Sequence, residues 1–191
     1  MNYMNHNDGK RMLLELADVM DRTASYWFLI QGTALGAYRD NGFVPTEKDI
    51  DIGILWEDCH WPQLAKELIT RKFEIQTISR PFAACRTIVA KKYGCKADLV
   101  GYIAWKEFRF AARPVDERNL PPYSIVHKAE LLQPPYHDVA LFGRSFQIPS
   151  PPEEYLALEY GDDWYTPRED HVSRTRVPNF VNKNVPLDLI W

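Results

Sequence analysis

The sequence predicts a mixed α/β fold, in which helices flank a short mixed β-sheet and a proline-rich C-terminal segment wraps around it. In the first half of the chain, segments with helical periodicity alternate with segments that have the two-residue period of strands. Hydrophobic residues make up 46% of the 191 residues, which is enough for a core of ordinary size. Eleven of the 14 prolines lie from Pro114 onward among aromatic residues, which indicates an ordered but irregular segment.

The first half of the sequence is predicted to alternate helices with strands. After a polar tail over residues 1–9, an apolar stripe at helical spacing predicts an amphipathic helix over residues 10–25. Residues 26–30 are typical of a buried strand, which ends at a Gly-Thr pair where Thr33 is the predicted N-cap of a short helix. Residues 49–55 alternate acidic or small residues with isoleucine, which predicts a strand buried on one face.

After this strand, a helix and four further strands are expected, of which the last follows the weakest pattern. A helix is expected over residues 62–72, with proline in its first turn. Further strands are expected over residues 73–79, 87–92, 97–105 and 107–112. The proline-rich half is expected to be loop-rich, apart from a helix that follows a Pro-Pro pair and ends at Gly161. The domain is therefore predicted over residues 10–170, with a C-terminal extension over residues 171–191.

The charge balance excludes some classes of protein. The chain has 23 basic and 26 acidic residues and a net charge of −3, so it is not expected to bind nucleic acid through a basic face. No segment is apolar for long enough to predict a transmembrane helix, and the polar N-terminus does not resemble a signal peptide. The three cysteines show no C-x-x-C spacing, so we expect reduced thiols in a cytoplasmic protein.

Three aspartates are the candidate catalytic and metal-ligating residues. Asp49 and Asp51 are two residues apart on the predicted strand, so their carboxylates project from the same face about 6.5–7 Å apart. Asp98 lies in a later, mostly apolar strand, where a charge is costly unless it is paired or binds a metal. Two Mg²⁺ or Mn²⁺ ions would suit these carboxylates and phosphoryl transfer, in which Asp98 could accept the proton of an attacking hydroxyl.

A Gly-Thr pair and an arginine are the candidate binding residues for a phosphorylated ligand. Gly32 lets a phosphate approach the backbone and Thr33 begins a helix, while Arg39 could neutralise further phosphate oxygens. Each feature also has an ordinary structural interpretation. The Asp-Ile-Asp pattern alone is common on solvated strands, and Asp98 could be paired with a lysine. The lysines nearest to it in the sequence are Lys91, Lys92 and Lys96.

The order of these motifs resembles the nucleotidyltransferase superfamily, which has the DNA polymerase beta-like fold. Within it, residues 31–53 are similar to the signature of the LicD and fukutin-related proteins: a Gly-Thr motif, an arginine, a Gly-Phe-Val-Pro segment and Asp-Ile-Asp-Ile. A second block over residues 142–167 is similar to the closing Pro, Glu-Tyr-Leu, Tyr-Gly, Trp, Pro pattern of that family. Here Thr46-Glu47-Lys48 replaces the usual Trp-Asp-Asp, which is expected to remove one acid.

The resemblance implies a function and roles for the residues that match. Members of the family transfer phosphocholine or a polyol phosphate from a CDP-activated donor to a glycan hydroxyl. By position, Asp49 and Asp51 would be metal ligands, and Asp98 would be the third ligand or the base. Gly32 and Thr33 would hold the donor phosphates, and Arg39 occupies the position of the family arginine.

Two other function classes remain open from the sequence. One is a nucleotidylyltransferase that uses a nucleoside triphosphate on a small molecule or sugar, and the other is a non-catalytic domain that binds a glycan or a protein. For the main hypothesis, the expected partners are a CDP-linked donor and a sugar or glycan acceptor, with peripheral contact to a membrane left open. Other polar and aromatic residues are expected to have structural roles, namely His127, His137, His171, Tyr160, Gly161 and Trp164.

Overall fold

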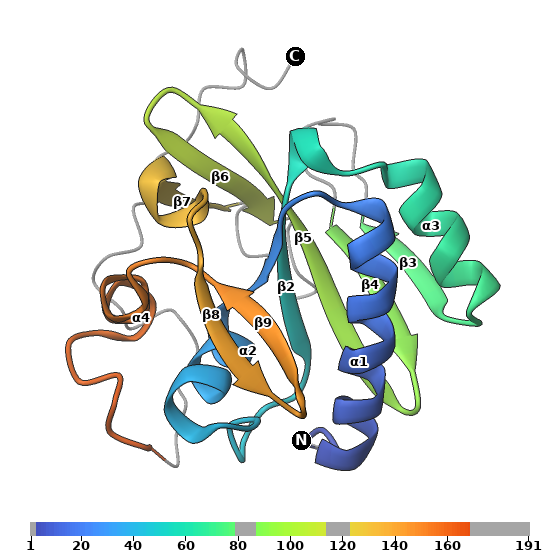
Figure 1. Cartoon of the computed structure of the whole chain (residues 1–191), viewed down its shortest axis with the longest axis horizontal. Coiled ribbons are helices and arrows are strands. Elements are labelled where there is room, and N and C mark those ends of the chain that lie inside the picture. Colours follow the sequence, from blue (N-terminus) through green and yellow to red (C-terminus); the bar gives the residue numbers. More distant parts are fainter. Residues whose placement is uncertain (1–2, 79–86, 114–122, 169–191) are drawn as a thin grey trace.

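The computed structural model describes residues 3–78, 87–113 and 123–168, which are organised around one mixed sheet (Figure 1). Its five main strands lie in the order β1-β2-β5-β4-β3. Their bounds are β1 (Trp27–Leu29), β2 (Ile50–Leu55), β5 (Cys95–Trp105), β4 (Thr87–Lys92) and β3 (Glu74–Ile78). Strands β2 and β5 are parallel, whereas the other neighbours are antiparallel. The predicted mixed α/β fold is thereby confirmed.

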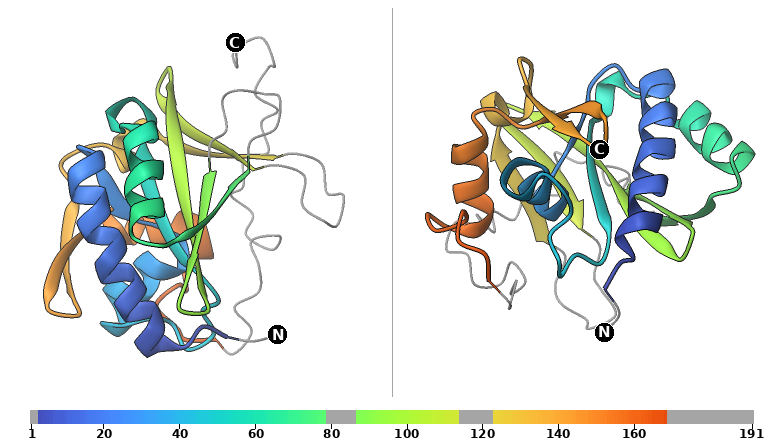
Figure 2. Two further views of the ribbon diagram at one scale, coloured as in Figure 1. Left: turned by 90° about the vertical axis from the view of Figure 1, so that its right-hand side faces the viewer. Right: turned by 60° about the horizontal axis from the view of Figure 1, so that its bottom comes forward.

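Helices α1 (His6–Thr23) and α3 (Trp61–Thr70) lie side by side on one face of this sheet (Figure 2). Trp27 of β1 donates a hydrogen bond of 3.1 Å to Asp21 of α1, and Trp27 pairs with Ile54 in the β1–β2 ladder. The isoleucines of β2 therefore face the helices. Asp51, which lies between Ile50 and Ile52 in β2, projects from the opposite face.

The first helix starts within the segment that the sequence analysis assigned to a polar tail. Helix α1 begins at His6 because the side-chain oxygen of Asn5 accepts hydrogen bonds from the backbone N–H groups of Asn7 and Asp8. Met4 is also buried and joins the hydrophobic core. Residues 3–9 are therefore part of the packed structure.

The opposite face of the sheet carries shorter elements. Helix α2 (Gln31–Leu35) follows β1 and continues into a π-helical turn, η1 (Gly36–Asp40). A short 3₁₀ turn, η3 (Ala129–Leu132), follows the strand over Tyr123–Lys128. Another, η2 (Trp56–Asp58), follows β2 on the side of α3, where Trp56 stacks on Trp61. Helix α4 (Pro152–Tyr160) contacts α2, and its C-terminal glycine, Gly161, has a φ of 92° that ends the helix as predicted.

The second half of the chain contains strands that the sequence analysis did not predict. These are β7 (Tyr123–Lys128), which extends the sheet beyond β6 (Phe108–Arg113), and the strands β8 (His137–Leu141) and β9 (Arg144–Ile148), which form a hairpin beside β1. Strand β6 itself pairs with β5 and corresponds to the strand expected over residues 107–112. The prediction of a loop-rich second half was wrong because the prolines stand outside the strands, where they do not interrupt a ladder. The predicted extension over residues 171–191 lies outside the described residues.

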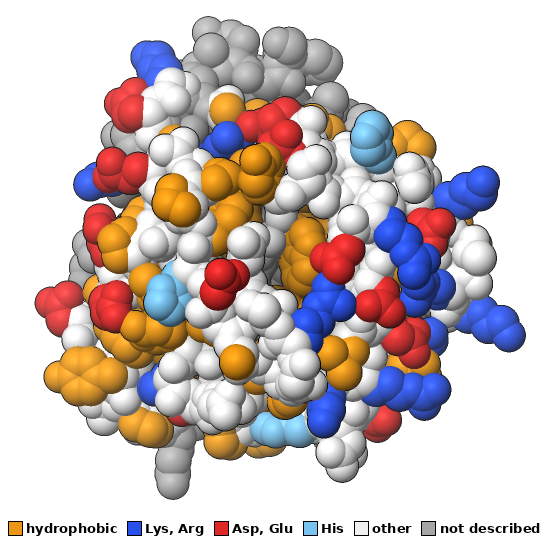
Figure 3. Space-filling view, in the orientation of Figure 1, with side chains coloured by type: hydrophobic (Ala, Val, Ile, Leu, Met, Phe, Trp, Pro, Cys, Tyr) orange, Lys and Arg blue, Asp and Glu red, His pale blue; other side chains and the backbone are white. Residues whose placement is uncertain are grey.

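Charged side chains of both signs alternate over α1 and α3 (Figure 3). Arg144 of β9 lies 3.1 Å from Asp18 of α1 and also pairs with Asp21, and Arg22 lies 3.8 Å from Glu67 of α3. Ion pairs therefore connect the elements on this face, and neither positive nor negative charge predominates there. Within the described residues, no helix combines the length and the apolar composition needed to cross a membrane.

Two of the three cysteines belong to the described residues, and both are free thiols. Burial raises the pKa of Cys59 to about 12 and also raises the pKa of Cys95. Both groups are therefore protonated and unreactive near neutral pH. Cys85 lies outside the described residues.

We predict that Gly53→Ala destabilises the sheet without removing a carboxylate. The ring of Phe28 lies over Gly53, and a Cβ atom there would meet a ring carbon at 2.5 Å. The free energy of unfolding, measured by urea denaturation, should fall by about 1–3 kcal/mol. Gly42→Ala is the matched control because the nearest atom to its Cβ would be 3.7 Å away. Equal losses in the two variants would contradict the packing argument.

Candidate functional site

Asp51 is the most rigidly held acidic residue of the candidate site. Asp51 is the second residue of β2, and it is only 3% exposed. Its backbone N–H donates to the hydroxyl of Thr33 at 2.9 Å, and its carbonyl accepts from the N–H of Ile30 at 3.1 Å. The start of α2 thus fixes the backbone from which the Asp51 carboxylate extends.

The prediction that Thr33 caps a helix was wrong. Helix α2 begins at Gln31, two residues earlier, and Ile30 occupies its N-cap without a side-chain hydrogen bond. Thr33 instead lies inside the helix, fully buried, with its hydroxyl on the Asp51 backbone. This hydrogen bond joins two residues that are 18 positions apart in the sequence, so rules for local helix capping could not predict it.

Glu47 completes a cluster of three carboxylates that the sequence analysis did not identify. Carboxylate oxygens of Glu47, Asp49 and Asp51 all lie within 4.8 Å of one another. The Thr46-Glu47-Lys48 segment has one acid where the family pattern Trp-Asp-Asp has two, and this remaining acid, Glu47, is the one that joins the cluster. Glu47 could have been identified from its spacing in the sequence, because residues two and four positions before Asp51 lie on the same side of an extended chain as Asp51.

Contacts with the N-terminal segment and with the preceding loop position Glu47. The Glu47 carbonyl accepts a hydrogen bond of 2.8 Å from the N–H of Met4, and its own N–H donates to the carbonyl of Val44 at 3.0 Å. The carboxylate lies against Gly32 of α2, in the space that a Cβ atom would need. Because residue 32 is glycine, the Glu47 carboxylate can lie against the backbone of α2. The expectation from the sequence was that a phosphate of the ligand approaches the backbone there.

Asp98 lies on the strand next to Asp51. The two residues are register partners in the parallel β2–β5 ladder, so their Cα atoms are about 4.8 Å apart and their side chains share one face. The Asp98 side chain is 13% exposed, and its Oδ1 atom makes no hydrogen bond within the described residues. The structure thus brings together the three predicted aspartates.

Lys96 lies between two of these aspartates. Its ammonium is 2.8 Å from Asp49 Oδ2 and 3.3 Å from Asp98 Oδ1. Burial by itself lowers the pKa of Lys96, but the charges of Asp49 and Asp98 outweigh that effect and raise the pKa above its ordinary value. Of the three lysines that the sequence offered as partners of Asp98, the structure selects Lys96, while Lys92 pairs with Glu15.

The guanidinium of Arg39 is already hydrogen-bonded within the protein. Its side chain is 8% exposed and makes two hydrogen bonds to Asp40, at 2.8 and 2.7 Å, and one of 3.1 Å to the carbonyl of Trp164. It therefore ties the end of η1 to the segment after α4. Its predicted contact with donor phosphates stays a prediction.

The second sequence block packs on the first motif. The hydroxyl of Tyr155 accepts a hydrogen bond of 2.9 Å from the N–H of Gln31, and the hydroxyl of Tyr38 bonds to Glu153. The ring of Trp164 packs against Tyr38 with centroids 5.9 Å apart. The structural role expected for Trp164 agrees with this contact, and α4 helps to position the start of α2.

The described histidines lie outside the carboxylate cluster. His127 is buried, and its Nε2 atom lies 3.1 Å from Oε1 of the buried Glu159. His137 packs edge-on against Tyr38 at 5.5 Å. Their expected structural roles agree with these contacts, whereas His171 lies outside the described residues.

The cluster fits a divalent cation of the Mg²⁺ or Mn²⁺ type. Carboxylate oxygens are the ligands that such hard cations prefer, and three of them converge here from one strand and the loop before it. Carboxylates at this separation repel one another when they are partly buried, and a divalent cation relieves that repulsion. The arrangement can therefore hold a cation beside the start of α2.

Comparison with known families and proteins agrees with this geometry. Residues 24–94 match the family model described as LicD/FKTN/FKRP, nucleotidyltransferase domain. Two proteins of Caenorhabditis elegans are similar over nearly the whole chain: uncharacterized protein T07A5.1 is 28% identical over 97% of it, and uncharacterized protein W02B3.4 is 26% identical over 94% of it. The chain spans about half the length of both, 50% and 47% respectively.

Solved structures of similar fold are nucleotidyltransferases. ANT(2″)-Ia in complex with adenylyl-2″-tobramycin has a TM-score of 0.50 and 14% identity, over 79% of this chain and 73% of that chain. The lincosamide antibiotic adenylyltransferase LnuA, with lincomycin bound, also has a TM-score of 0.50 and 14% identity, over 78% of this chain and 82% of that chain. At this identity, the similarity establishes the nucleotidyltransferase fold.

We predict that Thr33→Val lowers the free energy of unfolding by about 1–3 kcal/mol, because it leaves the buried N–H of Asp51 without its acceptor. Thr33→Ser keeps the hydroxyl and should lose much less. Urea denaturation of both variants measures the difference. If valine is tolerated as well as serine, the hydrogen bond does not hold β2 to α2.

Proposed function

Because residues 24–94 of the chain match the family model of the LicD/FKTN/FKRP nucleotidyltransferase domain, we propose that the protein is a metal-dependent phosphotransferase. In this proposal it moves phosphocholine or a related polyol phosphate from a CDP-activated donor to a glycan hydroxyl. The observation that carries the proposal is the convergence of Glu47, Asp49 and Asp51 within 4.8 Å. Asp98 adds a fourth carboxylate from the adjacent strand.

The proposed roles follow from the position of each group. Glu47, Asp49 and Asp51 would hold the cation, because their oxygens converge on one point. When bound, such ions withdraw charge from phosphoryl oxygens and from the leaving group. Asp98 would act as the base or as a further ligand, since it is the register partner of Asp51 on the adjacent strand and shares its face of the sheet.

The proposed reaction is an in-line displacement at the β-phosphorus of the donor. The acceptor hydroxyl loses its proton to Asp98 and forms the new P–O bond, and CMP leaves with the electrons of the broken bond. Gly32 and Thr33 would lie next to the donor phosphates, since α2 borders the carboxylates. A cytoplasmic location and contact with a membrane surface are further parts of the hypothesis.

Nucleotidylyl transfer is the second candidate function. Of the similar structures described above, one is an adenylyltransferase and the other is a complex with an adenylylated antibiotic. The fold that they share with this chain favours this alternative. In that reaction the acceptor attacks the α-phosphorus of a nucleoside triphosphate, and pyrophosphate leaves. The released product therefore distinguishes the two reactions.

We predict that the protein with Mg²⁺ releases CMP from a CDP-linked donor such as CDP-choline when a suitable glycan is present. Mass spectrometry of reactions with a panel of CDP-linked donors and nucleoside triphosphates measures the products. Asp51→Asn should lower the rate at least about 100-fold, because it removes a charged ligand from the cluster. Asp138→Asn, an exposed aspartate of β8, is the control and should be fully active.

Two outcomes would overturn the proposed reaction. Release of pyrophosphate from a nucleoside triphosphate, without CMP from any CDP-linked donor, would favour nucleotidylyl transfer. Failure of calorimetry to detect Mg²⁺ or Mn²⁺ binding to the wild-type protein would contradict both enzymatic functions and favour a binding domain.

A further inference from the structure

Lys96 takes part in two neighbouring features of the sheet. On one side, its ammonium lies between Asp49 and Asp98, at 2.8 and 3.3 Å. On the other side, it lines an open pocket of about 530 Å³ at the end of the β4–β5 hairpin. The pocket is rich in lysines, with Lys72, Lys91 and Lys92 also in its wall. Lys96 is therefore the residue that joins the acidic cluster to a basic pocket.

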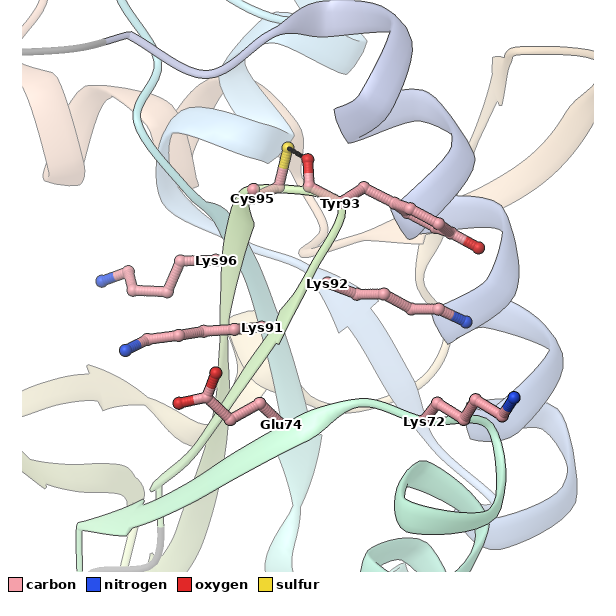
Figure 4. Close-up of a pocket in the computed structure, with 8 residues that line it drawn as sticks. Lys72, Glu74, Lys91, Lys92, Tyr93, Cys95 and Lys96 are labelled. Atoms are coloured by element: carbon pink, nitrogen blue, oxygen red, sulfur yellow. Dashed lines mark hydrogen bonds between the residues drawn. The ribbon is translucent and has the colours of Figure 1, made fainter.

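The side chains of Lys91 and Lys96 project from the same side of this hairpin, together with Glu74 (Figure 4). Lys91 and Lys96 are register partners in the antiparallel β4–β5 ladder, which places their Cβ atoms about 5 Å apart. Like charges opposite one another destabilise a sheet unless a partner neutralises them. Lys96 has its aspartates, and Lys91 has Glu74 as its register partner in the β3–β4 ladder, although no carboxylate among the described residues lies within ion-pair distance of Lys91.

The other lysine contacts of the pocket serve the fold. Lys92 projects to the opposite side of the hairpin, toward α1 (Figure 4). There it pairs with Glu15 and donates a hydrogen bond of 2.8 Å to the carbonyl of Arg71. Lys91 and Lys96 are therefore the pair that shares the face of the sheet with the carboxylates.

The position of Lys96 conflicts with a divalent cation. A cation held by Asp49 with help from Asp98 needs the same carboxylate oxygens that the ammonium contacts. A divalent ion and an ammonium also repel each other at such short distances. When one binds, the other must move away from the shared oxygens.

We propose that Lys96 is a displaceable counter-ion, which holds the aspartates in the metal-free protein and moves toward Lys91 when a divalent cation binds. The two ammonium groups then form a binding site for an anionic group of the substrate, such as a phosphate. This inference rests on the proposed function in one respect, because it takes the acidic cluster as the metal site. The inference adds that Lys96 competes with the metal for the carboxylates of Asp49 and Asp98.

The first test measures the affinity for Mn²⁺ alone by isothermal titration calorimetry. Removing the competing charge in Lys96→Gln should tighten Mn²⁺ binding about tenfold, within the usual range of coupling between two ligands. Lys96→Arg keeps a cation and should remain close to the wild type. Lys66→Gln, which removes an exposed lysine from α3, controls for the change in net charge and should have no effect.

The competition also predicts a change in stability that does not depend on activity. Without metal, Lys96→Gln leaves the aspartates uncompensated and should melt at a lower temperature than Lys96→Arg. Saturating Mn²⁺ should raise its melting temperature by more than it raises that of the wild type. Circular dichroism measures both values and shows whether each variant is folded.

The second test measures binding of inorganic phosphate to the Mg²⁺-saturated protein. Lys91→Gln and Lys96→Gln should each weaken phosphate binding at least about fivefold, whereas Lys66→Gln should not. Phosphate affinity equal to that of the wild type in both variants would overturn the anion site. Unchanged or weaker Mn²⁺ binding in a folded Lys96→Gln variant would overturn the competition.

These outcomes are distinguishable from failure of the proposed function. If the wild type binds Mn²⁺ and transfers a phosphoryl group while Lys96→Gln binds Mn²⁺ no more tightly, only the inference about Lys96 fails. If neither the wild type nor Lys96→Gln binds Mn²⁺, both the metal site and the inference are wrong.

Discussion

Repulsion among carboxylates is the constraint on which the site depends. Three carboxylates lie within 4.8 Å of one another, and a fourth lies on the next strand. Such charges separate or become protonated unless the fold holds them and a cation offsets them. Thr33 fixes the backbone of Asp51, Met4 fixes that of Glu47, and Lys96 supplies positive charge. Segments far apart in the sequence thus meet at one strand.

The part of the site that follows from local periodicity could be predicted from the sequence. Alternation along residues 50–55 places Asp51 opposite the isoleucines that pack under the helices, and the structure has this arrangement. The pairing of Asp51 with Asp98 was also accessible, because a charge in a mostly apolar strand needs a partner. These features depend on neighbours within a strand or on the cost of an isolated charge.

The features that the sequence analysis missed depend on tertiary contacts. The role of Thr33 requires the backbone of a strand 18 residues later, and the position of Glu47 requires the N–H of Met4. Strands β7 to β9 were missed for a different reason. Their proline-rich surroundings resemble a loop, although the prolines lie outside the paired segments. Composition measured over a long window hides such boundaries.

The hydrogen bond from Met4 to Glu47 links the carboxylate cluster to the residues just before α1, which begins at His6. Segments at helix ends fray more readily than sheet cores, so this N-terminal segment is a natural place for local opening. When the segment opens, the loop that carries Glu47 loses one of its anchors. A cation bound at the cluster would therefore slow amide hydrogen exchange at the N-terminus of α1, although no residue of that helix is among its ligands. Binding of a cation at the cluster and ordering of the N-terminal residues would therefore each favour the other.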